Sequence, residues 1–225
     1  MSIPPRTASL ARTATPWAVA GLVLIAALGA YLRLVHSGPF GVEEWWHGVA
    51  GATRGSAPHA VAVFMAEAGS GIGAAACTAI AAALLLALRR PRDAASVATA
   101  MVIGIAASET LKALVMRPRP WDPLFHAAGS SYPSGHSMGA AALAVSLALV
   151  AAESGRLSRS ASGWAWALAA GWVVVMMWSR TALHVHWLSD TLAGALLGVC
   201  AAVLSRRLWE RSAKPGSAPP PRLDA

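Results

Sequence analysis

The sequence predicts an all-α fold, a polytopic membrane bundle of about six transmembrane helices. Hydrophobic residues make up 56% of the 225 residues and charged residues only 12%, whereas a soluble domain carries about 25% charged residues. Six apolar stretches approach the roughly 20 residues that an α-helix needs to cross a bilayer. No repeat with a period of about 20–50 residues is visible, and the length favours one domain.

The expected spans follow one another along most of the chain. They cover residues 17–34, 71–88, 94–116, 136–152, 164–178 and 187–204. Arg6 and Arg12 precede the first span, as basic residues would in a signal peptide. No small-residue cleavage site follows that span, so we expect it to be retained as a membrane helix.

Two further segments differ from the spans. Residues 60–69 are apolar but too short to cross a bilayer alone, so we expect them to extend the second span or to lie at the interface. Residues 39–55 contain Trp45 and Trp46 close to Glu43. Tryptophan favours the membrane–water interface, which predicts an interfacial position for this segment.

Basic residues set the expected orientation. The net charge of +8 depends on 16 arginines and 2 lysines. Four basic clusters fall on one side if all six spans cross: Arg6 and Arg12; Arg89, Arg90 and Arg92; Arg156 and Arg159; Arg206, Arg207, Arg211 and Lys214. Because cytoplasmic loops carry an excess of arginine and lysine, both termini are expected in the cytoplasm. So few charges, without interleaved aromatic residues, do not indicate nucleic-acid binding.

The chain divides into one domain and a short tail. Residues 1–211 are expected to form a single integral membrane domain. Residues 212–225 are rich in proline and alanine and are expected to be a disordered C-terminal tail. The alanine- and arginine-rich composition is typical of a GC-rich genome. We expect a bacterial protein located in the inner (plasma) membrane.

The opposite side of the expected bundle carries an unusual amount of positive charge. Its three segments, residues 112–120, 131–136 and 179–190, hold Lys112, Arg117, Arg119, His136, Arg180, His184, His186 and Asp190. A charged side chain at the centre of a membrane helix costs about 2.5–3.5 kcal/mol on insertion scales, and basic residues on the outer side run against the orientation rule. We therefore expect these segments to converge on an anion.

The segment around His136 has the form of an anion-binding helix start. Pro133 cannot lie inside a helix, Ser134 is a good N-cap, and Gly135 lets a ligand approach the backbone. A helix that begins there directs its free N–H groups and its dipole at an anion, and His136 in the first turn could donate a proton. The alternative is that His136 only caps the helix or lines the interface.

The last segment pairs a histidine with a carboxylate. His186 and Asp190 are four residues apart and would share one face of a helix. A carboxylate bonded to one ring nitrogen fixes the tautomer and leaves the lone pair of the other nitrogen free to attack phosphorus. Arg180 lies six residues earlier and could donate two N–H groups to phosphate oxygens. The alternative is a structural polar pair that holds two helices together.

The first of the three segments supplies further cations. Lys112 offers a point charge and Arg119 a planar fork, and prolines end the helix near them. Ordinary snorkelling at the interface is the alternative for this segment. Glu109 could pair with Lys112. We interpret Arg117 as a rim residue that adds to the anion field, and His184 as structural.

Together these residues resemble the signature of the type 2 phosphatidic acid phosphatase family. The three parts are Lys-x6-Arg-Pro within residues 112–120, Pro-Ser-Gly-His at residues 133–136 and Ser-Arg-x5-His-x3-Asp at residues 179–190. Each part alone is weak evidence, but all three occur in order and with the expected spacing. That family is related in fold to the vanadium-dependent haloperoxidases.

The resemblance implies a helical bundle with a phosphate site at its outer rim and a phosphohistidine intermediate. By this resemblance His186 attacks phosphorus, Asp190 orients His186, and His136 protonates the leaving oxygen. The implied phosphate-binding residues are Lys112, Arg119, Ser134, Gly135 and Arg180. No metal ion and no cofactor are implied. A basic cradle is physically sufficient, because phosphoryl transfer depends mainly on positioning and charge stabilisation.

The expected function is hydrolysis of a lipid phosphate or diphosphate on the periplasmic side, with membrane lipids as the other partners. The resemblance implies undecaprenyl diphosphate, phosphatidylglycerophosphate, phosphatidic acid and lysophosphatidic acid as candidate substrates. The motifs do not choose among them, because these lipids share the phosphoryl group. Two alternatives stay open: transfer of the phosphate to another lipid on the same site, and a non-enzymatic protein that binds or transports lipid head groups. Halide oxidation is disfavoured, since we expect haloperoxidases to be soluble.

Overall fold

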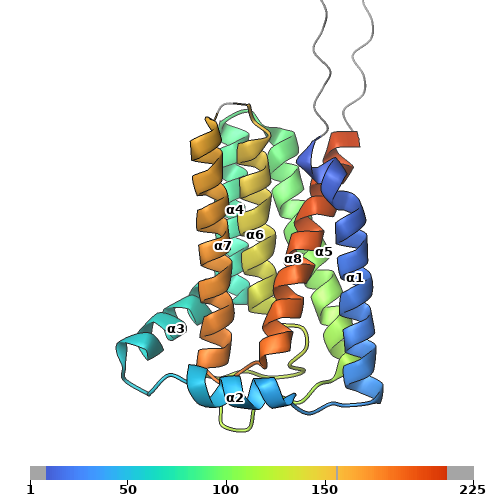
Figure 1. Ribbon diagram of the computed structural model, residues 1–225. Helices are drawn as coiled ribbons and strands as arrows, with labels where there is room; N and C mark the ends of the chain where they lie inside the picture. The colour runs from blue at the N-terminus through green and yellow to red at the C-terminus, as the bar shows by residue number, and fades with distance from the viewer. Residues whose placement is uncertain (1–8, 156, 212–225) are drawn as a thin grey trace, which may run out of the picture.

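The computed structural model describes residues 9–155 and 157–211, and the expected tail at residues 212–225 lies outside the described residues. The described chain folds into eight α-helices and contains no strand, which confirms the all-α prediction (Figure 1). The helices are α1 (Leu10–Leu34), α2 (Gly41–Ala50), α3 (Ala57–Ala68), α4 (Gly71–Ala87), α5 (Pro91–Val115), α6 (Gly135–Ala152), α7 (Arg159–Ala182) and α8 (Leu188–Arg211).

Five of these helices, α1, α5, α6, α7 and α8, are long and apolar enough to cross a membrane. The expected span at residues 71–88 corresponds to α4, which has 17 residues. A sixth span is complete only when α4 is taken together with α3, from which it is bent by 64°. Residues 60–69 fall mostly in that separate helix. The chain begins a new helix after the bend because the Ser70 side chain accepts a hydrogen bond from the Gly73 N–H.

Apolar side chains on the outside of the bundle identify an integral membrane protein. Only 11% of the apolar window in α7 is buried inside the protein, and large residues such as Trp164, Leu168 and Val174 are exposed. A soluble monomer rarely exposes a contiguous apolar surface of this extent. A spanning helix can expose such side chains to lipid, because its backbone hydrogen bonds are satisfied internally.

Glycines bring the starts of α6 and α8 together. Gly194 and Gly198 of α8 lie so close to α6 that an added Cβ would collide with the carbonyl oxygens of Ser134 and Met138. Such contact is typical of helix packing in membranes, where small residues let two backbones approach closely. It places the first three turns of α8 alongside the first turns of α6.

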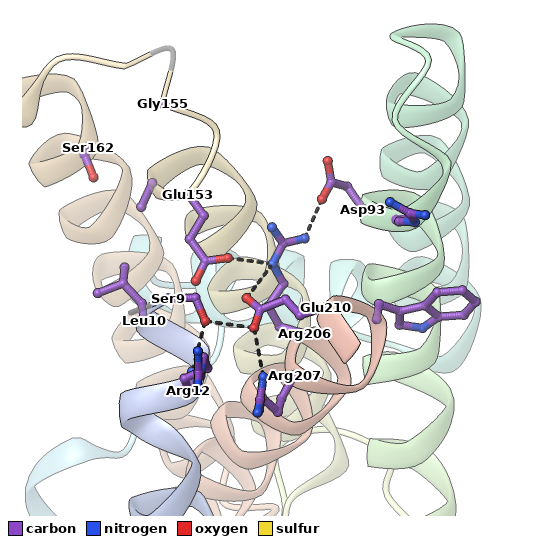
Figure 2. A pocket seen from close by; sticks show the side chains of 13 residues that line it. Ser9, Leu10, Arg12, Asp93, Glu153, Gly155, Ser162, Arg206, Arg207 and Glu210 are labelled. Carbon is purple, nitrogen blue, oxygen red and sulfur yellow. Dashed lines mark hydrogen bonds and ion pairs between the residues drawn. The ribbon is translucent and has the colours of Figure 1, made fainter. Parts of the chain in front are cut away.

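The basic clusters gather at one end of the bundle. The start of α1 and the end of α8 lie there, and the Ser9 hydroxyl donates to Glu210 at 2.8 Å (Figures 1 and 2). At the same end Arg206 of α8 pairs with Asp93 of α5 and with Glu153. The expectation that these clusters share one side is confirmed for the residues that the structure describes. Outside the described residues lie Arg6, Arg156 and Lys214.

A cavity of about 920 Å³ opens at this basic end, and ion pairs line it (Figure 2). Arg206 already bridges two carboxylates, and Arg207 lies 3.6 Å from the Glu210 carboxylate. These charges largely compensate one another, which is typical of a network that holds helix ends together. The candidate functional residues lie at the other end.

Helix α2 lies across that other end of the bundle (Figure 1). Its first turn is stabilised by Glu43, whose carboxylate accepts from the Phe40 N–H at 2.9 Å. Trp45 is exposed, as expected for an interfacial segment, whereas Glu43 is only 2% exposed. A carboxylate buried to this extent requires a cationic partner, and that partner belongs to the candidate site.

Candidate active site

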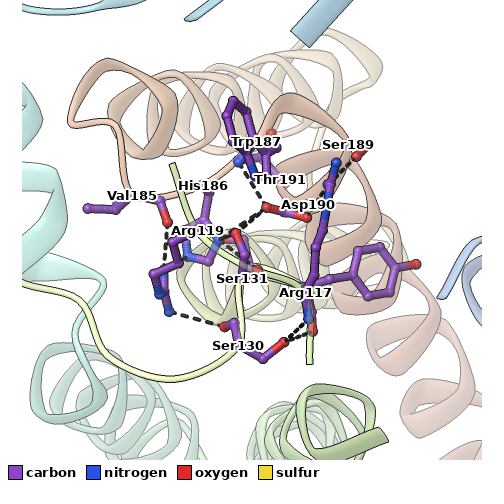
Figure 3. A network of polar contacts seen from close by, with 12 residues as sticks. Arg117, Arg119, Ser130, Ser131, Val185, His186, Trp187, Ser189, Asp190 and Thr191 are labelled. Carbon is purple, nitrogen blue, oxygen red and sulfur yellow. Dashed lines mark hydrogen bonds and ion pairs between the residues drawn. The ribbon is translucent and has the colours of Figure 1, made fainter. Parts of the chain in front are cut away.

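The three motif segments meet at the end of the bundle that α2 covers. The α5–α6 loop, the start of α6 and the α7–α8 loop converge there (Figures 1 and 3). The Ser134 N–H donates to the Asp190 carbonyl at 2.9 Å, which joins two of the motifs directly. His136 and His186 lie within electrostatic range of each other, and Arg119 lies within the same range of His186.

The hydrogen bonds of His186 define its tautomer. Its Nδ1 lies 2.8 Å from the carbonyl oxygen of Ser131, which can only accept. Its Nε2 lies 3.2 Å from Nη1 of Arg119, a group that can only donate. Nδ1 therefore carries the proton and Nε2 carries the lone pair. Figure 3 shows the ring of His186 next to Ser131 and Arg119. An imidazole in this state can act as a nucleophile through Nε2.

Asp190 supports His186 in a different way from the sequence expectation. Its Oδ2 is 3.7 Å from Nδ1 of His186, which is too long for a hydrogen bond. Oδ2 instead accepts from the Ser131 hydroxyl and from the Trp187 N–H. The reason is that α8 begins only at Leu188, so His186 precedes the helix and does not share a helical face with Asp190. The carboxylate thus holds the segment that fixes the imidazole and adds negative charge beside it.

The imidazole of His186 is neutral at physiological pH. Its ring is almost completely buried, and burial lowers the pKa of His186 to about 4. Asp190 opposes this shift, whereas the positive charge of Arg119 adds to it. A neutral ring keeps the lone pair on Nε2.

Arg117 and Glu43 form a buried chain of ion pairs that ends on Asp190. Arg117 Nη1 donates to Asp190 Oδ1 at 2.7 Å, and Nη2 donates to Glu43 Oε2 at 2.7 Å. Burial lowers the pKa of Arg117, but the charges of Asp190 and Glu43 outweigh burial and raise it overall. The interpretation of Arg117 as a rim residue is therefore wrong. Its guanidinium is buried because two carboxylates compensate its charge.

Glu43 also connects α2 to the start of α8. Its Oε1 accepts from the N–H and the hydroxyl of Ser189, at 2.8 and 2.6 Å. Contacts thus run without interruption from α2 through Arg117 to Asp190 and Ser131. Sequence reasoning missed Glu43 because the neighbouring tryptophans indicated an interfacial segment. Several arginines lie close together in the motif segments, and Asp190 alone cannot compensate their charge. This imbalance is the signal that could have indicated a second carboxylate nearby.

Arg180 holds unused hydrogen-bond donors inside the site. The residue is 1% exposed, and its Nε and Nη1 have no hydrogen-bond partner within the described part of the chain. The guanidinium carbon lies 5.8 Å from the centre of the Phe125 ring. A buried donor left unsatisfied costs about 1–3 kcal/mol, and more if it is charged. A buried cation with unsatisfied donors favours an anion as the partner of Arg180.

Arg119 lies directly against the lone pair of His186. Carbonyl oxygens of the surrounding loops hold it: Nη1 donates to Val185 at 2.6 Å, Nη2 to Ala128 at 2.9 Å and Nε to Gly129 at 3.1 Å. Burial lowers the pKa of Arg119, but a guanidinium stays charged at physiological pH. Carbonyl groups orient this cation without neutralising it, so its charge is available to a ligand at Nε2.

Lys112, Ser134 and Gly135 lie around the start of α6. Lys112 Nζ donates to Glu109 at 2.6 Å, which confirms the expected pair. A Cβ added to Gly135 would lie 3.3 Å from that Nζ, so the ammonium group faces the N–H groups of the helix start. Ser134 caps α6 by accepting from the Ser137 N–H, as expected, and is fully buried. The phosphate-binding roles of these residues stay predictions.

His136 lies in the first turn of α6, as expected. Its Nε2 is 3.0 Å from the Ala66 carbonyl of α3, so Nε2 donates and its ring is held by a helix whose position the sequence left open. The described residues provide no hydrogen bond at Nδ1, which leaves that nitrogen to exchange a proton with a ligand.

Comparison with protein-family models decides the family. A model of the PAP2 superfamily matches residues 93–214, which include all three motifs and more than half of the chain. The chain belongs to the PAP2 superfamily. Membership confirms the resemblance seen in the sequence. In the candidate site, Glu43, Arg117 and Ser131 lie beside the motif residues through their contacts with Asp190 and with one another.

Two curated relatives match about half of the chain. The Escherichia coli protein YbjG, which carries a provisional undecaprenyl-diphosphatase name, is 31% identical over 120 residues, or 51% of this chain and 56% of YbjG. An undecaprenyl-diphosphatase of Sulfolobus acidocaldarius is 31% identical over 131 residues, or 55% of this chain and 59% of the relative. The match thus spans less than two thirds of either relative.

Two solved structures share the fold. The transmembrane PAP2-type phosphatidylglycerolphosphate phosphatase of Bacillus subtilis gives a TM-score of 0.75 at 23% identity, covering 88% of this chain and 98% of that chain. LpxE of Aquifex aeolicus gives a TM-score of 0.61 at 20% identity, covering 75% of this chain and 96% of that chain. Both likenesses extend well beyond the motif region.

Proposed function

We propose that this PAP2 protein is a membrane lipid phosphatase that acts through a phosphohistidine intermediate. The observation that carries the proposal is the buried guanidinium of Arg180. Its Nε and Nη1 lack partners within the described chain, while Nε2 of His186 offers a lone pair in the same site. Free donors beside a nucleophile meet the two requirements of phosphoryl transfer, which are charge stabilisation and attack.

The first chemical step joins His186 to phosphorus. The Nε2 lone pair forms the new bond while the bond from phosphorus to the leaving oxygen breaks. The electron pair of the broken bond stays on the leaving oxygen, which takes a proton from His136. Nδ1–H continues to donate to the Ser131 carbonyl, and the Asp190 carboxylate, 3.7 Å away, stabilises the positive charge that develops on the ring.

The second step releases phosphate. His136, now neutral, accepts a proton from a water molecule, whose oxygen attacks phosphorus as the Nε2–phosphorus bond breaks. The bonding pair returns to Nε2, so His186 is again neutral and His136 again protonated. Lys112, Arg119 and Arg180 hold the phosphate oxygens in both steps, and Arg119 turns its Nη1 donor from Nε2 of His186 to one of these oxygens. Charge stabilisation by this cradle requires no metal ion.

An apolar groove supports a lipid as the substrate. The groove has a volume of about 380 Å³ and lies between α2, α7 and α8. Thr181 and Leu188 line it, and they lie one residue after Arg180 and two residues after His186. We assign the groove to the hydrocarbon tail of the substrate. Undecaprenyl diphosphate, phosphatidylglycerophosphate and phosphatidic acid fit this assignment, and the names of the relatives refer to the first two.

Filling the groove should weaken binding of long-tailed substrates. Val175→Trp is expected to raise KM about tenfold, since the loss of contact for about two CH2 groups at about 0.8 kcal/mol each corresponds to that factor. Hydrolysis of a water-soluble short-chain phosphate should not change. Val23→Trp on the exposed face of α1 is the matched control. Equal KM values for both variants and the wild type would contradict the assignment of the groove to the hydrocarbon tail.

Phosphate release across a panel of lipid phosphates tests the function. The purified protein in detergent, with a chelator present, should release inorganic phosphate from at least one of the three candidate lipids, and His136→Ala should lose most of this activity. Binding of lipid without release would favour a head-group binding protein. Label that reaches a second lipid instead of water would favour phosphate transfer.

We also propose that residues 1–211 form one catalytic domain whose site faces the outside of a bacterial inner membrane, with both termini in the cytoplasm. The basic clusters lie at the end of the bundle opposite α2 and the α7–α8 loop, which supports this orientation. In a Cys77→Ser, Cys200→Ser background, Arg54→Cys should react with a membrane-impermeant maleimide in spheroplasts. Leu157→Cys should react only after permeabilisation. The reverse pattern would invert the proposed topology.

A further inference from the structure

Two histidines and an aspartate meet outside the catalytic network, at the same end of the molecule. His47 belongs to α2, Asp122 to the α5–α6 loop and His184 to the α7–α8 loop. His47 Nε2 lies 2.9 Å from Asp122 Oδ1, and His184 Nδ1 lies 3.0 Å from Asp122 Oδ2. The two imidazole rings stack with their centres 3.8 Å apart. Segments far apart in the chain thus direct three metal-binding side chains at one point.

The surrounding backbone is shaped for this cluster. His184 has a φ of 52°, in the left-handed region that few residues other than glycine adopt. Gly51 provides the space for its ring, because a Cβ at this position would collide with Nε2 of His184. Nε2 of His47 is buried and has no hydrogen bond of good geometry to any described residue, although Asp122 is near. This nitrogen is not committed to another protein group.

We propose that His47, Asp122 and His184 bind a divalent transition-metal ion of the zinc type. The ligand atoms are His47 Nε2, His184 Nδ1 and one carboxylate oxygen of Asp122, all within 4.8 Å of one another. Zinc takes imidazole nitrogen and carboxylate oxygen at about 2.0–2.2 Å, and three protein ligands leave a fourth, tetrahedral position for water. Two nitrogen ligands disfavour Mg²⁺ and Ca²⁺, which prefer oxygen.

An ion at this position connects three segments around the catalytic site. Asp122 lies three residues after Arg119, and His184 lies two residues before His186. His47 adds α2 to the same point. Because an ion bound only by the folded state stabilises that state by mass action, zinc should raise the melting temperature. The ion takes no part in the chemical steps, so the metal site does not depend on the proposed function.

Zinc titration of the purified full chain in detergent, after chelator treatment and its removal, tests the site. We expect one Zn²⁺ per chain by calorimetry, and with Co²⁺ the visible absorption of a tetrahedral complex. His47→Gln, Asp122→Asn and His184→Asn should each weaken zinc binding at least about tenfold, because losing even an outer-shell partner of a metal costs about 10–100-fold. His36→Gln and His59→Gln alter histidines outside the cluster and should bind zinc like the wild type.

Asp122→Asn is the most informative variant, because the Asp122 side chain is 48% exposed and its loss leaves the core intact. Without metal this variant should release phosphate at the wild-type rate, which separates the metal site from catalysis. The proposal is overturned if the wild type binds neither zinc nor cobalt at micromolar concentration, or if all three variants bind zinc like the wild type. Binding that is lost in His136→Ala but kept in Asp122→Asn would assign the ion to the catalytic histidines and would also overturn it.

Discussion

Replacing His186 by alanine is expected to lower the rate of phosphate release by at least about 10⁴-fold, because loss of a catalytic nucleophile costs a hydrolase this much or more. The variant removes Nε2, which is the atom assigned to attack, and leaves the cationic cradle in place. The measurement is the initial rate on the best lipid of the panel. Rapid quenching with a radiolabelled substrate should trap an acid-labile phosphoprotein in the wild type and none in the variant.

His36→Ala is the matched control for this experiment. His36 is exposed, its Nε2 bonds to the Pro39 carbonyl and its ring stacks on Phe40. It lies outside the catalytic network, so its loss should leave both the rate and the trapped phosphoprotein unchanged. His186→Gln keeps a polar side chain of similar length opposite Arg119. It is the second variant to measure if His186→Ala does not fold. Full activity in a folded His186 variant would exclude the phosphohistidine mechanism.

Replacing Arg117 by leucine is expected to destabilise the fold by about 3–5 kcal/mol, which is the usual cost of removing one partner from a buried ion pair. Arg117 compensates two carboxylates at once, Glu43 and Asp190, and its side chain is fully buried with theirs. The loss should appear as a large fall in melting temperature. Any folded remainder should have a lower kcat, because the Asp190 carboxylate, which holds the segment that positions His186, loses the cation bonded to its Oδ1.

The exposed Arg54 provides the comparison, since it lies in the short α2–α3 connection near the same end. Arg54→Leu should change stability by no more than about 0.5 kcal/mol. Glu43→Gln should fall between these two variants, because it leaves the pair of Arg117 with Asp190 intact. Equal melting temperatures for Arg117→Leu and Arg54→Leu would show that the buried ion pairs contribute little to folding.

Local sequence was sufficient to predict most of the helices, but not the bend between α3 and α4. Long apolar stretches have no other stable form in a bilayer than a helix or a barrel, so the spans followed from composition. The bend lies at residues 67–71, where Ser70 caps α4, and the sequence left open whether residues 60–69 extend the next helix or turn away from it. The separate helix α3 in turn supplies the Ala66 carbonyl that holds His136, so this contact was also invisible in the sequence.

The candidate site was predictable as a set of residues but not as a set of contacts. Motif spacing identified His186 and Asp190, and the structure brings them to one place. The hydrogen-bond partners of His186 and Asp190 depend on where α8 begins. They also depend on backbone carbonyls such as that of Ser131. Every residue has a backbone carbonyl, so the sequence does not indicate which one will act as a partner. Arg117 was underestimated for a related reason, because its partner Glu43 is 74 residues away in the chain.

The close packing of α8 on α6 has a consequence for how a bulky head group enters and leaves. At Gly194 and Gly198 the two helices touch through their backbones, so they behave as one rigid unit that carries His136, Asp190 and the helix start. We therefore expect substrate entry and product release to depend on displacement of α2 and α7, whose side chains line the apolar groove together with Leu188 of α8. Lipids of different head-group size should differ mainly in the rate of that movement, while the geometry of attack stays the same for all of them.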